Sequence, residues 1–172
     1  KRLPVEVTQN VNIDLMVVAG VIAYHNAKWK HLHIGDADRQ LLLDIKSSGI
    51  RLGVISSGLV RKQIEKILRL EIDKYIDPKL IFITHSVGVA KSNVQLYESA
   101  IAATGCEASR IMHVGDHPYH DIDTANAAGM VTAWVNGGGK HSVNEPRTSP
   151  AFKISCFAEL RDVLVSNYGL NK

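Results

Sequence analysis

The stretch "IRLGVISSGLVRKQIEKILRL", residues 50–70, contains a strand, a turn and a helix in succession, and it decides the fold class. Residues 50–56 form a short run with β-branched side chains, which is typical of a strand buried on both faces of a parallel sheet. Residues 59–70 place apolar side chains on one stripe and charged side chains opposite, which predicts an amphipathic helix. A strand that leads directly into a helix predicts a βα unit.

The same alternation continues on both sides of this unit. Helical spacing covers 37–49, 93–105, 123–129 and 157–169, and short apolar runs that predict strands cover 80–84, 110–115, 131–136 and 152–155. Strands that alternate with helices predict right-handed crossovers and a mostly parallel sheet. We therefore expect a three-layer, doubly wound α/β fold with its ligand site at the carboxyl ends of the strands.

Residues 1–33 differ from the rest, and we expect two parts, an N-terminal segment 1–33 and an α/β core 34–172. The longest apolar run, "LMVVAGVIAY" from Leu15 to Tyr24, has about half of the roughly 20 residues that a membrane helix needs. This run therefore predicts a buried segment, with a helix favoured over a strand, and no membrane association.

Composition excludes several other classes of protein. The net charge of +3 comes from 20 basic and 17 acidic residues that are interspersed along the chain, so no nucleic-acid footprint is indicated. The two cysteines, Cys106 and Cys156, lie far apart, which predicts neither a disulfide framework nor a cysteine zinc site. We expect a cytoplasmic protein that acts on small molecules.

Polar side chains follow three of the predicted strands. Ser56 follows the first strand, Lys91 lies in the loop after the second, and Asp116 and Asp121 follow the third. A hydroxyl and an ammonium group suit a phosphoryl oxygen, and carboxylates suit Mg²⁺. Each residue has a simpler structural interpretation, as a turn or helix cap or as solvated surface, but their shared placement at strand ends favours a site.

The stretch "HVGDHPYHDID", residues 113–123, also offers a histidine metal site as an alternative. His113 alternates with apolar neighbours on the predicted strand, so we interpret it as a core histidine. The glycine and Pro118 disfavour a shared helical turn for His117 and His120, which we expect to shape the loop or the substrate rim. "NGGGK", residues 136–140, lacks the spacing of a phosphate loop and predicts a turn.

Three motifs resemble the haloacid dehalogenase superfamily of phosphohydrolases: "LLLDIKSSGIRLGVISSG" (41–58), "GVAKSNVQLYESAI" (88–101) and "IMHVGDHPYHDIDTANAAGMVTAWVN" (111–136). The resemblance implies that Ser56, Ser57, Gly58 and Lys91 bind the phosphorylated substrate, with Ser56 and Lys91 as catalytic residues. It also implies that Asp116 holds Mg²⁺ and that Asp121 supports this metal site. The implied core is preceded by a short, mainly helical remnant of a cap, residues 1–33.

The same resemblance implies a nucleophilic aspartate in a DxD motif on the first, central strand, which forms an aspartyl-phosphate. The DxD of Asp36 and Asp38 falls at the start of a predicted helix, where a helix cap is expected. The missing strand belongs between the strand that ends at Ser56 and the strand before Asp116. Its absence leaves two inner edges of unpaired backbone groups.

We therefore expect that an N-terminal piece of the gene product precedes Lys1. The expected function is that of a Mg²⁺-dependent phosphatase core for a small phosphorylated metabolite, inactive as this chain alone. The alternative is a non-catalytic binding or assembly module of the same fold. Unpaired inner edges also favour association between copies of the chain.

Overall fold

A computed structural model describes residues 12–137 and 144–170 of the chain. The chain divides into two units, Lys1–His33 and Ile34–Lys172. The interpretation of "NGGGK" as a turn lies in part outside the described residues, because residues 138–140 are not among them.

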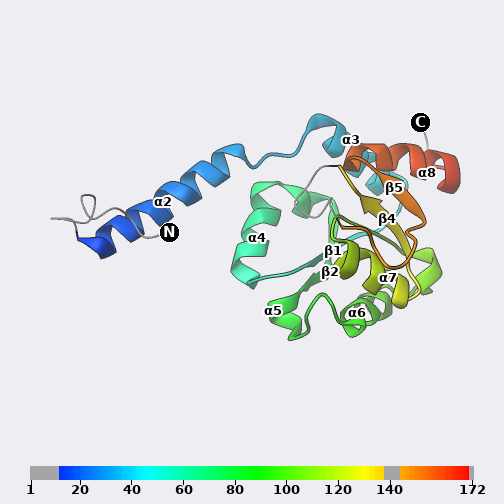
Figure 1. The fold of residues 1–172 in the computed structure, drawn as a ribbon. Helices are drawn as coiled ribbons and strands as arrows, with labels where there is room; N and C mark the ends of the chain where they lie inside the picture. The colour runs from blue at the N-terminus through cyan, green and yellow to red at the C-terminus, as the bar shows by residue number, and fades with distance from the viewer. Residues whose placement is uncertain (1–11, 138–143, 171–172) are drawn as a thin grey trace. The chain divides into compact units, whose positions relative to one another are not determined.

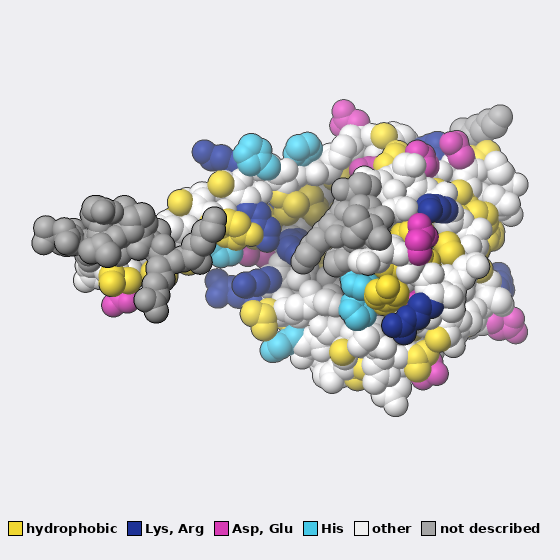
Figure 2. Space-filling view, in the orientation of Figure 1, with side chains coloured by type: hydrophobic (Ala, Val, Ile, Leu, Met, Phe, Trp, Pro, Cys, Tyr) yellow, Lys and Arg dark blue, Asp and Glu magenta, His cyan; other side chains and the backbone are white. Residues whose placement is uncertain are grey.

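The described part of the first unit is one long helix, α2, which spans Ile13–His31. Its N-cap is Asn12, whose side-chain oxygen accepts from the backbone N–H groups of Asp14 at 3.0 Å and Leu15 at 3.1 Å. The prediction of a helix is confirmed, but the prediction that the apolar run is buried is wrong, because no residue of α2 is buried. Within the described part of this unit α2 has no second element to pack against, and Figure 2 shows hydrophobic side chains on its surface. No helix among the described residues is both long and apolar enough to cross a bilayer.

The second unit alternates strands and helices, as the sequence predicts (Figure 1). Its elements are α3 (Asp36–Ser47), β1 (Leu52–Ser56), α4 (Val60–Arg69), η1 (Ile72–Lys74), β2 (Ile76–Ile83), α5 (Thr84–Val87), α6 (Val94–Thr104), η2 (Ala108–Arg110), β3 (Met112–Gly115), η3 (Pro118–Asp123), α7 (Thr124–Ala127), β4 (Val131–Val135), β5 (Phe152–Ile154), η4 (Phe157–Glu159) and α8 (Leu160–Tyr168).

Helices cover both faces of the strands, so the three-layer α/β prediction is confirmed. One core cluster packs α3 and α8 against β4 and β5, and partly buried Met112 and Val114 of β3 contact it. The intervening residue, His113, lies against Tyr97 of α6, with ring centroids 5.0 Å apart. Successive side chains of a strand point to opposite faces of a sheet, so these contacts place the two helical layers on opposite faces.

The strands do not form one continuous sheet. β1 pairs in parallel with β2, with Ser56 opposite Ile83, and β3, β4 and β5 form a separate parallel sheet in that order. Within the described part of the chain, no strand pairs with the inner edges of β1 and β3.

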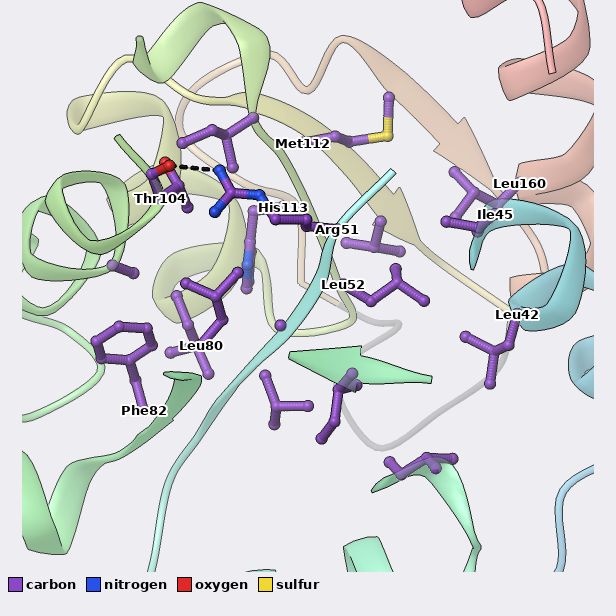
Figure 3. Close-up of a pocket in the computed structure, with 18 of the residues that line it drawn as sticks. Leu42, Ile45, Arg51, Leu52, Leu80, Phe82, Thr104, Met112, His113 and Leu160 are labelled. Carbon is purple, nitrogen blue, oxygen red and sulfur yellow. Dashed lines mark hydrogen bonds between the residues drawn. The ribbon is translucent and has the colours of Figure 1, made fainter. Parts of the chain in front are cut away.

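A cavity of about 470 Å³ lies between these two strand edges, and we call it the central slot. Its lining includes Leu52–Ile55 of β1, Leu80 and Phe82 of β2, and Met112–Val114 of β3. Figure 3 shows side chains from both sheets around the same space, together with Leu42, Ile45 and Leu160. Voids larger than a water molecule are few in a close-packed domain, and this one lies between two strand edges that have no strand partner among the described residues.

The DxD pair of Asp36 and Asp38 lies away from any strand end, as the sequence predicts. Asp36 and Asp38 occupy the first turn of α3, where carboxylates favour the helix dipole. The N-cap position itself belongs to Gly35, and no side-chain hydrogen bond caps this helix. The two aspartates therefore stabilise the start of α3 through their charge rather than through the capping hydrogen bond that we expected.

Candidate active site

The loop Ser56–Gly58 leaves the carboxyl end of β1 and leads into α4. The Ser56 hydroxyl donates to Gln63 Oε1 at 3.1 Å, and Gln63 Nε2 donates to the Ser57 carbonyl at 2.9 Å. The Gly58 N–H donates to Thr84 Oγ1 at 3.0 Å, which ties the loop to the end of β2. The N-cap of α4 is Leu59, which provides no side-chain acceptor, so the positive end of the helix dipole faces this loop.

Lys91 and Asp121 form a buried ion pair. Lys91 lies in the turn between α5 and α6, and Asp121 lies in η3, one turn beyond the end of β3. Their Nζ and Oδ1 atoms are 2.5 Å apart, and their side chains are 18% and 3% exposed. The structure therefore brings together two residues that are thirty positions apart in the chain.

The rest of the Asp121 carboxylate is also engaged. Oδ2 accepts from the His117 backbone N–H at 3.0 Å, and His113 Nε2 lies 3.5 Å from Oδ1. Burial raises the pKa of Asp121, but the nearby His113 ring and the Lys91 charge lower it more, so the net pKa lies well below its usual range. Because 3.5 Å is the limit of hydrogen bonding, Lys91 is the stronger partner.

The side chain of Tyr97 in α6 lies on the buried side of this ion pair. Its hydroxyl donates to the His120 carbonyl at 2.6 Å, and its ring packs edge-on against His113. Burial, followed by the negative charge of Asp121, raises the pKa of Tyr97 far above its usual range. Tyr97 therefore stays protonated and anchors η3 as a hydrogen-bond donor.

Gly115, the last residue of β3, makes room for Asp121. A Cβ atom at this position would lie 2.5 Å from both Cβ and Cγ of Asp121. Real Cβ contacts are not this short, so a side chain here forces η3 away from the strand. The close approach of Asp121 therefore explains why glycine occupies position 115.

We predict that Gly115→Ala lowers the free energy of unfolding by about 2 kcal/mol, the usual range for inserting a methyl group into packed space. It should also separate Asp121 from Lys91. Urea unfolding measures the first effect, and a crystal structure of the variant shows the second. Gly20→Ala is the matched control, because a Cβ there meets nothing within 4 Å. Equal stability of Gly115→Ala and the control contradicts the steric assignment.

Asp116 follows β3 directly and its side chain is exposed. The backbone carbonyl of Asp116 accepts from Trp134 Nε1 at 3.2 Å, which fixes the chain at the point where the carboxylate projects. A single exposed carboxylate fits one oxygen ligand of Mg²⁺. Among the residues that the structure describes, no cluster of three His, Cys, Asp or Glu side chains could hold a metal ion.

The histidines of residues 113–123 take structural positions. His117 is the N-cap of η3, and its Nδ1 accepts from the backbone N–H groups of Tyr119 at 3.2 Å and His120 at 3.1 Å. The rings of His117 and His120 lie 4.0 Å apart. His113 is buried, so its interpretation as a core histidine is confirmed. His117 shapes the loop as expected, through a capping interaction.

Sequence reasoning missed Gln63 and Thr84 as partners of the Ser56–Gly58 loop. Gln63 lies on the polar stripe of an amphipathic helix, where a solvent-facing residue is the default expectation. Its position, seven residues after Ser56 and one turn into α4, is a signal that could have identified it.

These observations first define a class: a doubly wound α/β protein whose polar and charged side chains gather at the carboxyl ends of parallel strands. The family model for haloacid dehalogenase-like hydrolases matches residues 5–135, and the chain belongs to this family.

Two curated relatives and one solved structure illustrate the similarity. Glyceraldehyde 3-phosphate phosphatase of Pyrococcus abyssi is 40% identical over 122 residues, which cover 71% of this chain and 50% of that protein. The enzyme of the same name from Pyrococcus furiosus is 34% identical over 157 residues, which cover 91% of this chain and 65% of that protein. The magnesium-bound HAD-hydrolase YfnB of Bacillus subtilis shares the fold, with a TM-score of 0.63 at 22% identity over 75% of this chain and 53% of that chain.

The chain therefore spans between one half and two thirds of the length of these curated relatives.

Proposed function

We propose that this chain supplies the substrate- and metal-holding part of a phosphatase that acts on a small phosphorylated metabolite. The observation that carries the proposal is the buried Lys91–Asp121 ion pair beside the exposed carboxylate of Asp116. This arrangement offers a positive charge for a phosphoryl group and a carboxylate for a hard cation beyond the carboxyl ends of β2 and β3. The names of the relatives support glyceraldehyde 3-phosphate as the first substrate to test.

Each residue of the site has a proposed role. Ser56 donates a hydrogen bond from its hydroxyl to a phosphoryl oxygen. Ser57 and Gly58, in the same loop, help to bind the substrate. Lys91 neutralises charge that develops on the phosphoryl group and orients the nucleophile. Asp121 holds Lys91 in place through their 2.5 Å contact.

We propose Mg²⁺ as the cofactor, with Asp116 as its direct ligand from this chain. Bound Mg²⁺ supplies electrostatic stabilisation of phosphoryl oxygens. Both oxygens of Asp121 are engaged, one by Lys91 and one by the His117 backbone N–H, so Asp121 supports the metal site indirectly. The magnesium-bound state of the YfnB structure is consistent with this cofactor.

The nucleophile of the proposed reaction lies on a strand that fills the central slot. Its carboxylate attacks phosphorus and forms an aspartyl-phosphate, the alcohol leaves with a proton from the second aspartate of the DxD motif, and water then releases inorganic phosphate. The described residues do not offer this strand, since Asp36 and Asp38 lie in the first turn of α3, and Asp121 and Asp123 lie in η3. The chain by itself is therefore proposed to be inactive.

The central slot favours a second candidate function, a non-catalytic binding or assembly module. Open parallel edges recruit further strands, including those of other copies of the chain. We also propose a cytoplasmic location, which the two free thiols of Cys106 and Cys156 support.

Activity of a longer form that includes an N-terminal DxD strand tests the proposal. We predict Mg²⁺-dependent phosphate release from an aryl phosphate and from glyceraldehyde 3-phosphate, and a loss of at least about a hundredfold in Asp116→Asn. Asp36→Asn is the matched control and should keep full activity, because Asp36 lies in the first turn of α3. Unchanged turnover in Asp116→Asn rejects the phosphatase assignment, and turnover by the 172-residue chain alone rejects the proposed missing nucleophile.

A further inference from the structure

Gln63 links both sides of the Ser56–Gly58 loop through one side chain. Its Oε1 accepts from the Ser56 hydroxyl at 3.1 Å, and its Nε2 donates to the Ser57 carbonyl at 2.9 Å. Lys66, one turn further along α4, donates to the same Oε1 at 3.2 Å. The orientation of the amide is determined by these partners, because an ammonium group only donates and a carbonyl only accepts.

The backbone of the loop is shaped to admit this side chain. Gly58 has φ +127°, a conformation that L side chains rarely adopt, and a Cβ atom there would lie 2.7 Å from Gln63 Nε2. The Gly58 N–H donates to Thr84 Oγ1, so the loop is held by α4 on one side and by the end of β2 on the other.

A serine hydroxyl can donate one hydrogen bond, and in this structure Ser56 donates it to Gln63 Oε1. Phosphoryl oxygens are acceptors, so a bound phosphate needs the same hydrogen-bond donor. When Ser56 turns its hydroxyl to phosphate, Gln63 Oε1 keeps Lys66 as a donor and is not left without a partner. The amide can therefore release Ser56 at low cost while Nε2 still holds the Ser57 carbonyl.

We propose that Gln63 is a positioning residue of the phosphate-binding loop, which holds Ser56 and Ser57 in place before phosphate binds and gives up the Ser56 hydroxyl when it does. This inference rests on the proposed function, because it assigns Gln63 to the phosphate site of that phosphatase. Gln63 acts through Ser56 and the loop backbone.

The test compares the full chain with Gln63→Ala, Ser56→Ala and the double variant, and inorganic phosphate is the probe. We expect Gln63→Ala to weaken phosphate binding roughly tenfold, because a loop that Gln63 no longer holds has to become ordered when phosphate binds. In the Ser56→Ala background, the same change should cost much less, because its partner is gone. Gln40→Ala is the matched control, a helical glutamine whose Nε2 donates to Asp44 at 2.9 Å. Phosphate affinity comes from amide shifts of Ser57 and Gly58 in nuclear magnetic resonance spectra.

Two results overturn the inference. One is an equal, additive loss in both backgrounds, which indicates a general structural role. The other is unchanged backbone order of Ser57 and Gly58 in Gln63→Ala, measured by heteronuclear relaxation without phosphate. If the parent chain does not bind phosphate, the proposed function fails for this chain, and the relaxation result alone decides whether Gln63 positions the loop.

Discussion

A peptide that carries an apolar strand is expected to raise the unfolding midpoint of the 172-residue chain. The designed peptide has about five β-branched residues followed by Asp-x-Asp, a usual strand length. It fills the central slot, where the inner edges of β1 and β3 have no strand partner within the described residues. At a peptide concentration about one hundred times its Kd, the gain is about 2.7 kcal/mol, or roughly 8 °C.

The physical reason is the number of backbone groups that become paired. A strand in the slot completes hydrogen bonds on both of its sides and buries apolar side chains against Leu52, Leu80 and Met112. Amide hydrogen exchange of β1 and β3 should slow together when the peptide is added. A peptide of the same composition with a central proline is the control, since proline removes a ladder donor. Protection of neither edge contradicts the assignment of the slot to a strand.

The second large effect is expected at the buried ion pair. Lys91→Met leaves the Asp121 carboxylate, 3% exposed, without its cation, and we predict a loss of about 3–5 kcal/mol in the free energy of unfolding at neutral pH. The double variant Lys91→Met/Asp121→Asn should recover part of that loss, because no unpaired buried charge remains. If the single variant does not fold, recovery of folding in the double variant still tests the claim.

The pH dependence of these variants has a definite sign. Asp121 has a lowered pKa in the folded chain, so its contribution to stability is present above the unfolded value near 4 and is lost as the pH falls through the folded value. Asp121→Asn should therefore lose less stability than the parent chain between about pH 5 and pH 2. Lys74→Met is the control, since its pair with Glu71 is exposed and should contribute little to stability. An effect of Lys91→Met no larger than that of Lys74→Met contradicts the assignment.

The alternation of strands and helices was predictable because periodicity reports which faces are buried. β1, α4 and β3 lie within about two residues of their expected positions. β2 begins at Ile76 rather than near Leu80, because pairing of Ile76 with Leu52 extends a strand whose own sequence contains Pro78. Pairing with a neighbouring strand is not visible in local patterns.

The apolar run of α2 gives the opposite lesson. Its composition predicts burial, but burial needs a partner surface, and the described part of its unit has none. The prediction was wrong because hydrophobicity shows only that burial of a segment is favourable. Whether a surface is present to bury it depends on the rest of the molecule. An exposed apolar helix is typical of an interaction surface.

The sequence predicted part of the site. Strand-end placement predicts that Ser56, Lys91, Asp116 and Asp121 share one edge, and of this set the structure brings Lys91 and Asp121 into contact. The sequence did not indicate that Lys91 contacts Asp121, since side chains thirty residues apart meet only through tertiary packing. Gln63 was missed for a related reason. The sequence of α4 contains several polar side chains, and nothing in it shows which of them contacts the loop.

The most direct test of the central claim is phosphate release by the chain mixed with the DxD strand peptide. We predict no release from the 172-residue chain alone and Mg²⁺-dependent release that increases with occupancy of the central slot. A peptide with Asn-x-Asn should bind equally well and restore no activity, because it lacks the nucleophile and the proton donor. Equal release with the two peptides, or release by the chain alone, contradicts the claim that a strand in the slot completes the site.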